Sequence, residues 1–132
     1  MLNAYLIDST RAEAVTHPLT LAAMQDTVGG YIAPAFTVPS PTRPGFAVTG
    51  YVNDEGILMD LPLTLVHTES EDPLFGPVLI CGLDEETGDT TPLDADELDW
   101  IKSRLRLLAS IGSFSPEGGT KTRAVHGLYL TA

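Results

Sequence analysis

The stretch Leu21–Ile32, LAAMQDTVGGYI, constrains the fold of this chain more than any other. Its apolar residues recur at the spacing of one helical face: Leu21, Met24 and Val28. Gly29 follows where a helix ends most easily in a left-handed conformation, and Gly30 allows the chain to turn. An aromatic and β-branched run then begins at Tyr31. We therefore expect a helix over about residues 19–28, a stop, and a strand.

The two glycines have an alternative interpretation, in which they let a ligand approach the backbone. Such a cleft would be formed by Gly29, Gly30 and Tyr31. Glycine-rich phosphate loops, however, follow a G-x-G-x-x-G or G-x-x-x-x-G-K-[ST] pattern, and this stretch has neither. The sequence therefore favours a structural turn, and we expect no cofactor.

A second helix is predicted over about residues 92–109. Thr91 is suited to be its N-cap, Pro92 to occupy its first position, and Asp94 to reach back to the cap. Its apolar positions form one stripe: Leu98, Ile101, Leu105 and Leu108. Acidic residues precede basic residues along it, which is the order that the helix dipole favours.

Runs of β-branched and aromatic residues between turn signals predict the strands. The runs are Ala4–Ile7, Ala14–Thr16, Tyr31–Val38, Phe46–Val52, Leu74–Leu83 and Ala124–Thr131. The most apolar run, Leu74–Leu83, is expected to be a central strand, whereas Pro62 argues against a central strand at Leu61–Val66. Ile57–Met59 is expected to resume as a strand or a short helix. Together these elements predict an α+β fold with a mostly antiparallel or mixed sheet.

Length and composition are those of one folded domain. The chain has 132 residues, of which 43% are hydrophobic, so we expect a single globular domain over residues 1–132 with a proline-rich loop at 39–44. The N-terminus does not resemble a signal peptide and no apolar run is long enough to span a bilayer, so we expect a cytoplasmic protein without membrane contact. Cys81 has no second cysteine to pair with and lies in an apolar run, so burial is expected.

Charge is the unusual feature of the composition. The net charge is -11, and Asp54–Asp99 holds 14 of the 18 acidic residues without one lysine or arginine. From Trp100 onward five basic residues stand against one acid. A field of this sign repels nucleic acid and favours a basic protein partner, or the self-association of oppositely charged parts into a homo-oligomer.

The candidate interaction residues lie in two acidic turns. They are Asp54 and Glu55 in one turn and Asp84, Glu85, Glu86 and Asp89 in the other. Neither turn matches the twelve-residue calcium frame that ends in glutamate, so we expect solvated turns rather than metal sites.

Other motifs that carry chemistry are missing from the sequence. The three histidines, His17, His67 and His126, do not have the spacing of a zinc site, and we expect no metal. There is no G-x-S-x-G motif, and Gly118–Thr122 resembles a phosphate loop only superficially. No catalytic residue is predicted, and the sequence favours a non-enzymatic role over an enzyme.

Four short motifs occur in an order that resembles a known family. They are MQDTVGGYI at Met24–Ile32, NDEG at Asn53–Gly56, LP at Leu61-Pro62 and GPVLICG at Gly76–Gly82. In this order they resemble domain of unknown function 3846, a family of small proteins in phages, plasmids and their bacterial hosts. The resemblance covers about residues 2–91. It implies an α+β fold and a mobile-element setting, and it supplies no catalytic residue.

Three functions remain open at this point. The leading hypothesis is an acidic accessory protein of a mobile genetic element that occupies a basic protein surface. Its extreme form, mimicry of a DNA backbone, requires the carboxylates on one face at about phosphate spacing. The alternative is a small-ligand-binding protein or enzyme with a cleft near Gly29-Gly30. The third is a homo-oligomer in which the acidic middle contacts the basic C-terminal helix.

Overall fold

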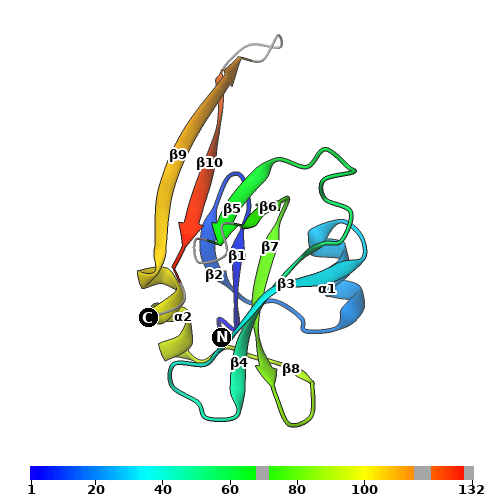
Figure 1. Ribbon diagram of the computed structural model, residues 1–132, viewed down its shortest axis with the longest axis vertical. Helices are drawn as coiled ribbons and strands as arrows, with labels where there is room; N and C mark the ends of the chain where they lie inside the picture. Colours follow the sequence, from blue (N-terminus) through cyan, green and yellow to red (C-terminus); the bar gives the residue numbers. More distant parts are fainter. Residues whose placement is uncertain (68–71, 115–119, 130–132) are drawn as a thin grey trace.

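A computed structural model of the chain describes residues 1–67, 72–114 and 120–129. Ten strands and two helices follow one another in this described part (Figure 1). In chain order they are β1 Ala4–Ile7, β2 Ala12–Val15, α1 Leu21–Val28, β3 Ile32–Pro39, β4 Phe46–Asn53, β5 Leu63–His67, β6 Asp72–Phe75, β7 Val78–Asp84, β8 Thr90–Thr91, α2 Ala95–Ser103, β9 Leu105–Phe114 and β10 Thr120–Leu128.

The strands form two sheets. The larger has the order β2-β1-β7-β4-β3, with the short β8 paired to β7, and every neighbouring pair in it is antiparallel. The smaller has the order β6-β5-β10-β9, and its β5–β10 pair is parallel. The α+β class and the mixed pairing predicted from the sequence are therefore confirmed.

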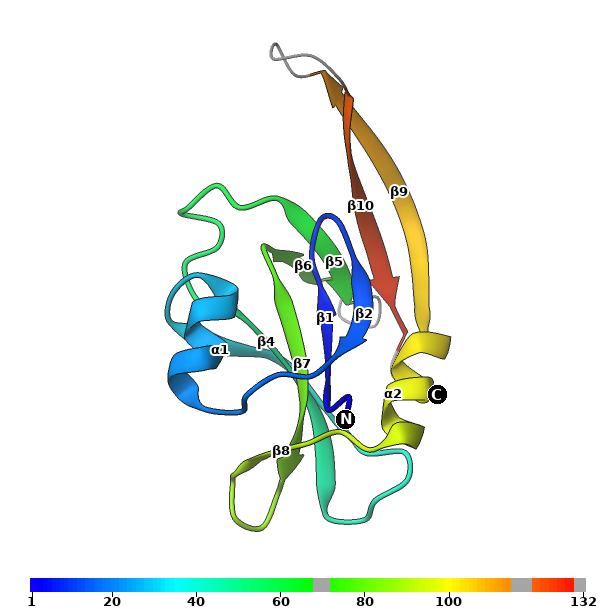
Figure 2. The same cartoon turned by 180° about the vertical axis from the view of Figure 1, so that it is seen from behind.

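The larger sheet is covered on both faces. On one face α1 packs against a cluster that includes Leu6, Met24, Leu79 and Cys81. On the other face the smaller sheet and α2 enclose the main core. The larger sheet contributes side chains of β1, β3, β4 and β7 to this core, and the smaller sheet contributes side chains of β5, β6 and β10. Figure 2 shows the two helices on either side of the strands. Because β7 is central in this arrangement, its residues Val78–Cys81 are fully buried, as predicted for this apolar run.

The first helix ends where the double glycine predicted it would. The Thr20 side chain accepts a hydrogen bond from the Ala23 N–H and caps the start of α1. Gly29 ends the helix at φ 84°, and its N–H donates to the Gln25 carbonyl. Glycine reaches this left-handed conformation without the steric cost that a side chain would add.

The second helix is shorter than the sequence predicted. Asp94, rather than Thr91, is its N-cap, and it forms a capping box with Glu97. The helix ends at Ser103 and β9 begins at Leu105, so the predicted helix over 92–109 is wrong at both ends. Leu105 and Leu108 fit the predicted helical stripe, but pairing with β10 satisfies the backbone of this segment and overrides the helical pattern.

One predicted strand is two strands in different sheets. The run Leu74–Leu83 is interrupted at Gly76, which has φ 79°, and at Pro77. The chain before the break belongs to β6 in the smaller sheet, and the chain after it is β7 in the larger sheet. Pro62 directly precedes β5, which lies between β6 and β10, so the argument against an interior strand there was wrong. A proline before the first strand residue removes no ladder bond.

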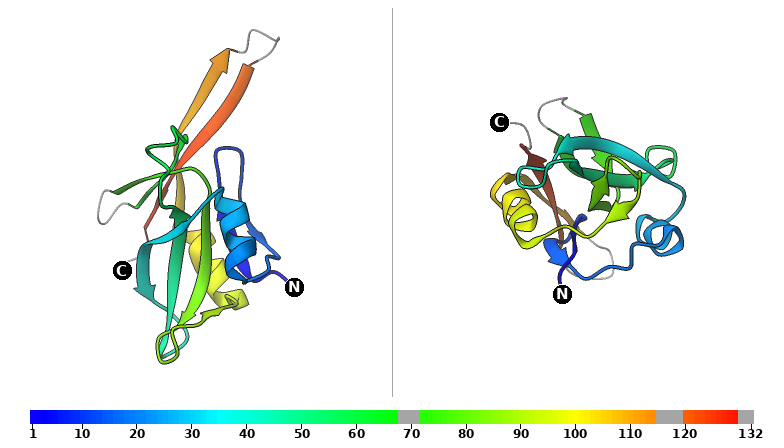
Figure 3. Two further views of the ribbon diagram at one scale, coloured as in Figure 1. Left: turned by 90° about the vertical axis from the view of Figure 1, so that its right-hand side faces the viewer. Right: turned by 90° about the horizontal axis from the view of Figure 1, so that it is seen from below.

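The strands β9 and β10 form a two-stranded ribbon, here called the arm, that extends away from the rest of the molecule (Figure 3). The end of the arm near α2 contacts the core, and Leu128 is fully buried there. The closing strand that was predicted at Ala124–Thr131 begins earlier, at Thr120, and its last residues lie outside the described part of the chain. The tertiary structure therefore consists of a two-sheet body and one projecting arm.

Candidate functional site

Two of the family-like motifs meet at the side chain of Asn53. Its Nδ2 donates to the Val28 carbonyl at the end of α1, 3.1 Å away, and its Oδ1 accepts from the Glu55 N–H at 2.8 Å. The Asp54 N–H donates to the Tyr31 carbonyl at 2.8 Å. Asn53 is only 4% exposed, so these bonds are made away from water. The turn after β4 is thereby fixed to the helix–strand junction.

The double glycine supports this contact. An added Cβ at Gly30 would lie 3.1 Å from Asn53 Nδ2, so a side chain there would press on the buried amide. Tyr31 is 74% exposed, so its side chain lies mostly in solvent. The pocket next to the junction includes Asn53 in its lining, but not Gly29, Gly30 or Tyr31. These three residues therefore have a structural role in the described arrangement.

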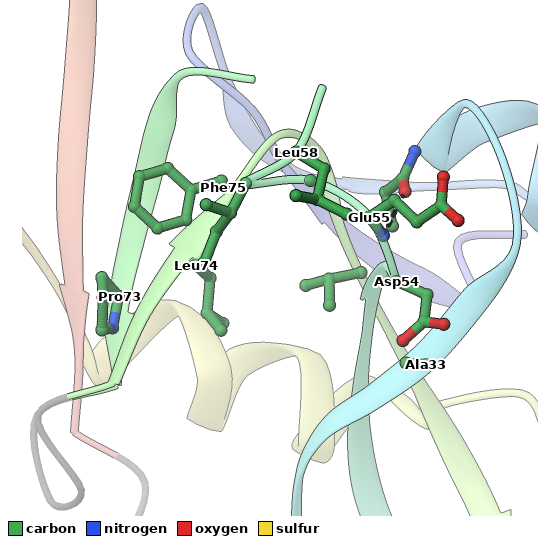
Figure 4. A pocket seen from close by; sticks show the side chains of 11 residues that line it. Ala33, Asp54, Glu55, Leu58, Pro73, Leu74 and Phe75 are labelled. Carbon is green, nitrogen blue, oxygen red and sulfur yellow. Dashed lines mark hydrogen bonds between the residues drawn. The ribbon is translucent and has the colours of Figure 1, made fainter. Parts of the chain in front are cut away.

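The neighbouring pocket, here called the turn pocket, has a volume of ≈ 440 Å³. Its lining comes from β3, the end of β4, the following turn and β6: Ala33, Val52, Asn53, Asp54, Glu55, Gly56, Ile57, Leu58, Pro73, Leu74 and Phe75. Figure 4 shows the side chains of Pro73, Leu74 and Phe75 on one side and the carboxylates of Asp54 and Glu55 on the other. The pocket is thus an apolar hollow with an acidic rim.

The turn that carries this rim is held in one conformation. Gly56 is buried, and an added Cβ there would lie 3.0 Å from the Phe75 carbonyl oxygen, so β6 can approach only a glycine. The Gly56 carbonyl accepts from the Leu61 N–H at 3.0 Å, which closes the turn. Residues 57–59 were expected to be strand or helix, but they form this turn because its backbone bonds are local.

The turn presents large apolar side chains to solvent. Ile57 is 71% exposed and Leu58 is 85% exposed, next to a pocket whose inner wall includes the buried Leu74. Adjacent exposed apolar residues beside an apolar hollow are typical of a binding surface.

The two acidic turns predicted as interaction sites do not lie together. Asp84 pairs with Phe46 at the start of β4, whereas Asp54 directly follows the end of that strand. Eight strand residues separate the turns by roughly 25 Å. The six carboxylates therefore form two groups: Asp54 and Glu55 at the turn pocket, and Asp84, Glu85, Glu86 and Asp89 at the opposite end of the larger sheet.

A buried carboxylate that the sequence analysis missed lies at the N-terminus of α2. Glu97 is fully buried, and its oxygens accept from Arg43 Nη2 at 2.7 Å and Ser40 Oγ at 2.6 Å. The Asp94 N–H also donates to Glu97, as part of the capping box. The D-x-x-E spacing could have indicated this cap. Through these hydrogen bonds Glu97 connects the proline-rich loop to α2.

The histidines and the cysteine do not build a reactive site among the described residues. His67 stacks on Phe36 with ring centroids 4.9 Å apart, His17 lies before α1, and His126 lies on β10. No group of three metal-ligating side chains occurs in the described part of the chain. Burial raises the pKa of the Cys81 thiol to about 12, so the thiolate that reacts with electrophiles is not formed near neutral pH.

A second, larger groove lies between α2 and the β1–β2 hairpin. Its volume is ≈ 660 Å³, and Tyr5, Leu93 and Leu98 contribute to its walls. Both signs of charge line it, since Asp99 and Lys102 are among its residues. It therefore lacks the single-signed rim that distinguishes the turn pocket.

Fold and site together define a small α+β protein with an apolar pocket below an acidic rim. The chain belongs to the family described as domain of unknown function (DUF3846), whose sequence profile matches residues 2–106. The match extends past the last motif quoted above and includes α2 and the first residues of β9. No curated protein and no solved structure matches the chain. Neither helix of the described residues has the length and apolar character needed to cross a membrane.

Proposed function

We propose that this protein is a non-enzymatic interaction module that binds a basic surface of another protein through the turn pocket. The observation that carries the proposal is the position of Asp54 and Glu55, both exposed, at the rim of an apolar hollow. None of the residues that line the pocket is a lysine or an arginine, and neither residue type occurs from residue 44 to residue 101. A partner that presents an apolar side chain between basic residues fits both properties.

The two properties have different roles in such a complex. A hollow of ≈ 440 Å³ has room for at least one large apolar side chain. Burying one leucine side chain contributes about 1.5–3 kcal/mol. The carboxylates at the rim remain near water, so they accelerate encounter and select a basic partner more than they add affinity.

The proposal also includes the biological setting. The family resemblance to proteins of phages, plasmids and their hosts supports an accessory protein of a mobile genetic element whose partner is a basic protein. Mimicry of a DNA backbone would need all of the carboxylates on one face. Because the two acidic turns lie at opposite ends of β4, we limit the proposal to a basic protein surface.

The alternative, a small-ligand site or an enzyme at the double glycine, has less support. Such a site needs a deep cleft that includes Tyr31, and acid–base chemistry in it needs a partly buried carboxylate. The pocket beside the junction includes neither, since Tyr31 lies outside its lining and both of its carboxylate residues are exposed.

Peptide titrations followed by amide NMR shifts test the proposal. The probe is a twelve-residue peptide with two central leucines flanked by arginine and lysine, and its control carries glutamate at the flanking positions. We expect shifts at Asn53, Gly56 and Leu58 with the basic peptide only, and weaker binding at higher salt.

Two charge-reversal variants locate the binding site. Asp54→Lys/Glu55→Lys should lower the affinity of the basic peptide about tenfold or more. Glu85→Lys/Glu86→Lys changes the net charge equally at the far acidic turn and should have a much smaller effect. Equal losses in both variants would show that only overall charge matters, and shifts confined to other residues would also contradict the proposal.

A further inference from the structure

The four edges of the two sheets are not protected equally. β2 has four residues and includes Glu13, β3 includes Pro34 and Pro39, and β6 has four residues and includes Pro73. Short length, charge and proline are the devices by which proteins prevent an edge strand from pairing with another chain. The fourth edge, β9, has ten residues and lacks these devices over most of its length.

The sequence of β9 shows why this edge is less protected than the other three. Arg106 is its only charged residue, and residues 107–114, LLASIGSF, include neither charge nor proline. The pairing with β10 has one irregularity, opposite Val125 and His126, and continues in regular register from Ala109 to Phe114. Near the base of the arm Leu107 is 61% exposed. An uncharged, regular edge of this length is a template for strand addition.

The arm also differs from the body in charge. Residues 105–128 contain three basic residues and one acid, a net charge of +2, so the remainder of the chain has a net charge of -13. In an antiparallel pair of arms, the tip of each arm lies next to the body of the other copy. The positive arm then meets a negative body, while the two bodies are held apart at opposite ends of the pair.

We propose that β9 pairs with β9 of a second copy of this chain, in antiparallel orientation about a two-fold axis. Such an interface is self-complementary, because the same unpaired N–H and C=O groups face each other from both copies. It removes both open edges at once and joins the two smaller sheets into one. The residues involved lie almost wholly beyond the part matched by the family, so the proposal concerns this chain rather than the family.

Mass measurement by light scattering during size-exclusion chromatography tests the proposal on the full chain. The expected mass is twice the 14.1 kDa of one chain at protein concentrations of tens of micromolar. The dimer should persist at about 0.5 M salt, because main-chain hydrogen bonds between paired strands are not screened as surface charges are. A monomer mass throughout, or a mass that grows without limit into filaments, would overturn the proposal.

Two neighbouring proline variants provide a matched pair. Alternate residues of a strand direct their N–H groups to opposite neighbours, so Ser110→Pro and Ile111→Pro remove one N–H facing β10 and one facing outward. One of the two should give a folded monomer whose melting temperature does not depend on protein concentration, and the other should destabilise the arm. Dimers in both variants would contradict edge pairing. Because Asp54→Lys/Glu55→Lys leaves the arm intact, its dimer mass should be unchanged even if the peptide titrations fail.

Discussion

At the scale of single residues, Asn53 has the most consequential position in this structure. Its buried amide connects the end of α1 to the turn that forms the acidic rim. The backbone N–H of the next residue, Asp54, bonds the Tyr31 carbonyl just before β3. The next two residues, Asp54 and Glu55, carry the charges of the turn pocket, so the hydrogen bonds of Asn53 position their carboxylates. A buried donor and acceptor that lose their partners cost more than the net value of the bonds they make.

Replacing Asn53 tests this role. Asn53→Ala leaves the Val28 carbonyl and the Glu55 N–H without their partner, and we expect a loss of about 1–3 kcal/mol in the free energy of unfolding. Urea denaturation measures it. Asn3→Ala is a matched control, because the half-buried Asn3 also makes two bonds, both to the His17 backbone. A larger loss for Asn3→Ala than for Asn53→Ala would contradict this account.

The sequence predicted part of the site at this scale. The acidic turn at Asp54 and Glu55 was found because asparagine, aspartate and glycine have known turn preferences. The apolar half of the pocket was missed because Leu74 and Phe75 come from another sheet, about twenty residues further along the chain. Only long-range pairing places them beside the turn, and no local pattern encodes that pairing.

At the scale of elements, the proline-rich loop and α2 form one unit. Arg43 reaches from the loop to Glu97, and its Nε lies 3.5 Å from an oxygen of Asp94. The sequence predicted a proline-rich loop here, and the structure adds that its polar groups satisfy a buried carboxylate. A charge that is fully buried is tolerated only when it is paired and hydrogen-bonded.

A double-mutant cycle on Arg43 and Glu97 measures this connection. Glu97→Gln removes the charge that neutralises the partly buried guanidinium, and we expect a loss of about 3 kcal/mol or more in unfolding free energy. The coupling energy of Arg43→Gln with Glu97→Gln should lie in the range of about 0.5–3 kcal/mol. Arg11→Gln breaks an exposed pair with Glu13 and should cost less than about 1 kcal/mol. Additive effects at Arg43 and Glu97 would rule out the connection.

The same scale explains the largest error of the sequence analysis. Residues 105–108 have helical spacing, yet the chain leaves the helix at Arg104, whose N–H donates to the carbonyls of Trp100 and Ile101. The start of α2 was displaced by three residues because Asp94 and Glu97 make a complete capping box, which Thr91 cannot form with Asp94 in the same way. The ends of α2 are therefore set by the capping box and by the strand pairing of β9, not by the apolar stripe.

At the scale of the whole molecule, the α+β class and most strand positions were predictable, whereas the division into two sheets was not. The strands of the larger sheet have the alternation or apolar runs that identify strands locally. The smaller sheet depends on the switch at Gly76-Pro77 and on the parallel pairing of β5 with β10. Neither feature leaves a periodic signal in the sequence.

Protonation of His126 links pH to the stability of this smaller sheet. Burial lowers the pKa of His126 below its ordinary value of 6.5, so the unfolded chain binds a proton at pH values where the folded chain does not. Protonation therefore stabilises the unfolded state relative to the folded state as the pH falls through about 6.5, and the free energy of unfolding decreases. The slope for one proton is at most about 1.4 kcal/mol per pH unit.

Urea denaturation at pH 7.5 and 5.5 measures this effect. We expect the wild-type chain to lose more stability on acidification than His126→Gln does, since glutamine does not titrate. Equal losses in the two proteins would show that His126 is not responsible.

The parallel pairing of β5 and β10 has a consequence for the order of folding. His126 lies opposite Leu65, so this contact joins positions 61 residues apart. The larger sheet also contains a long-range contact, since Tyr5 lies opposite Ile80, 75 residues away. Loop entropy therefore does not by itself set the order of the two sheets, whereas the order of synthesis does. During synthesis β5 cannot acquire this neighbour until residues 126–128 have left the ribosome. We therefore expect the larger sheet, β1 to β4 with β7, to form during synthesis before β10 completes the smaller one.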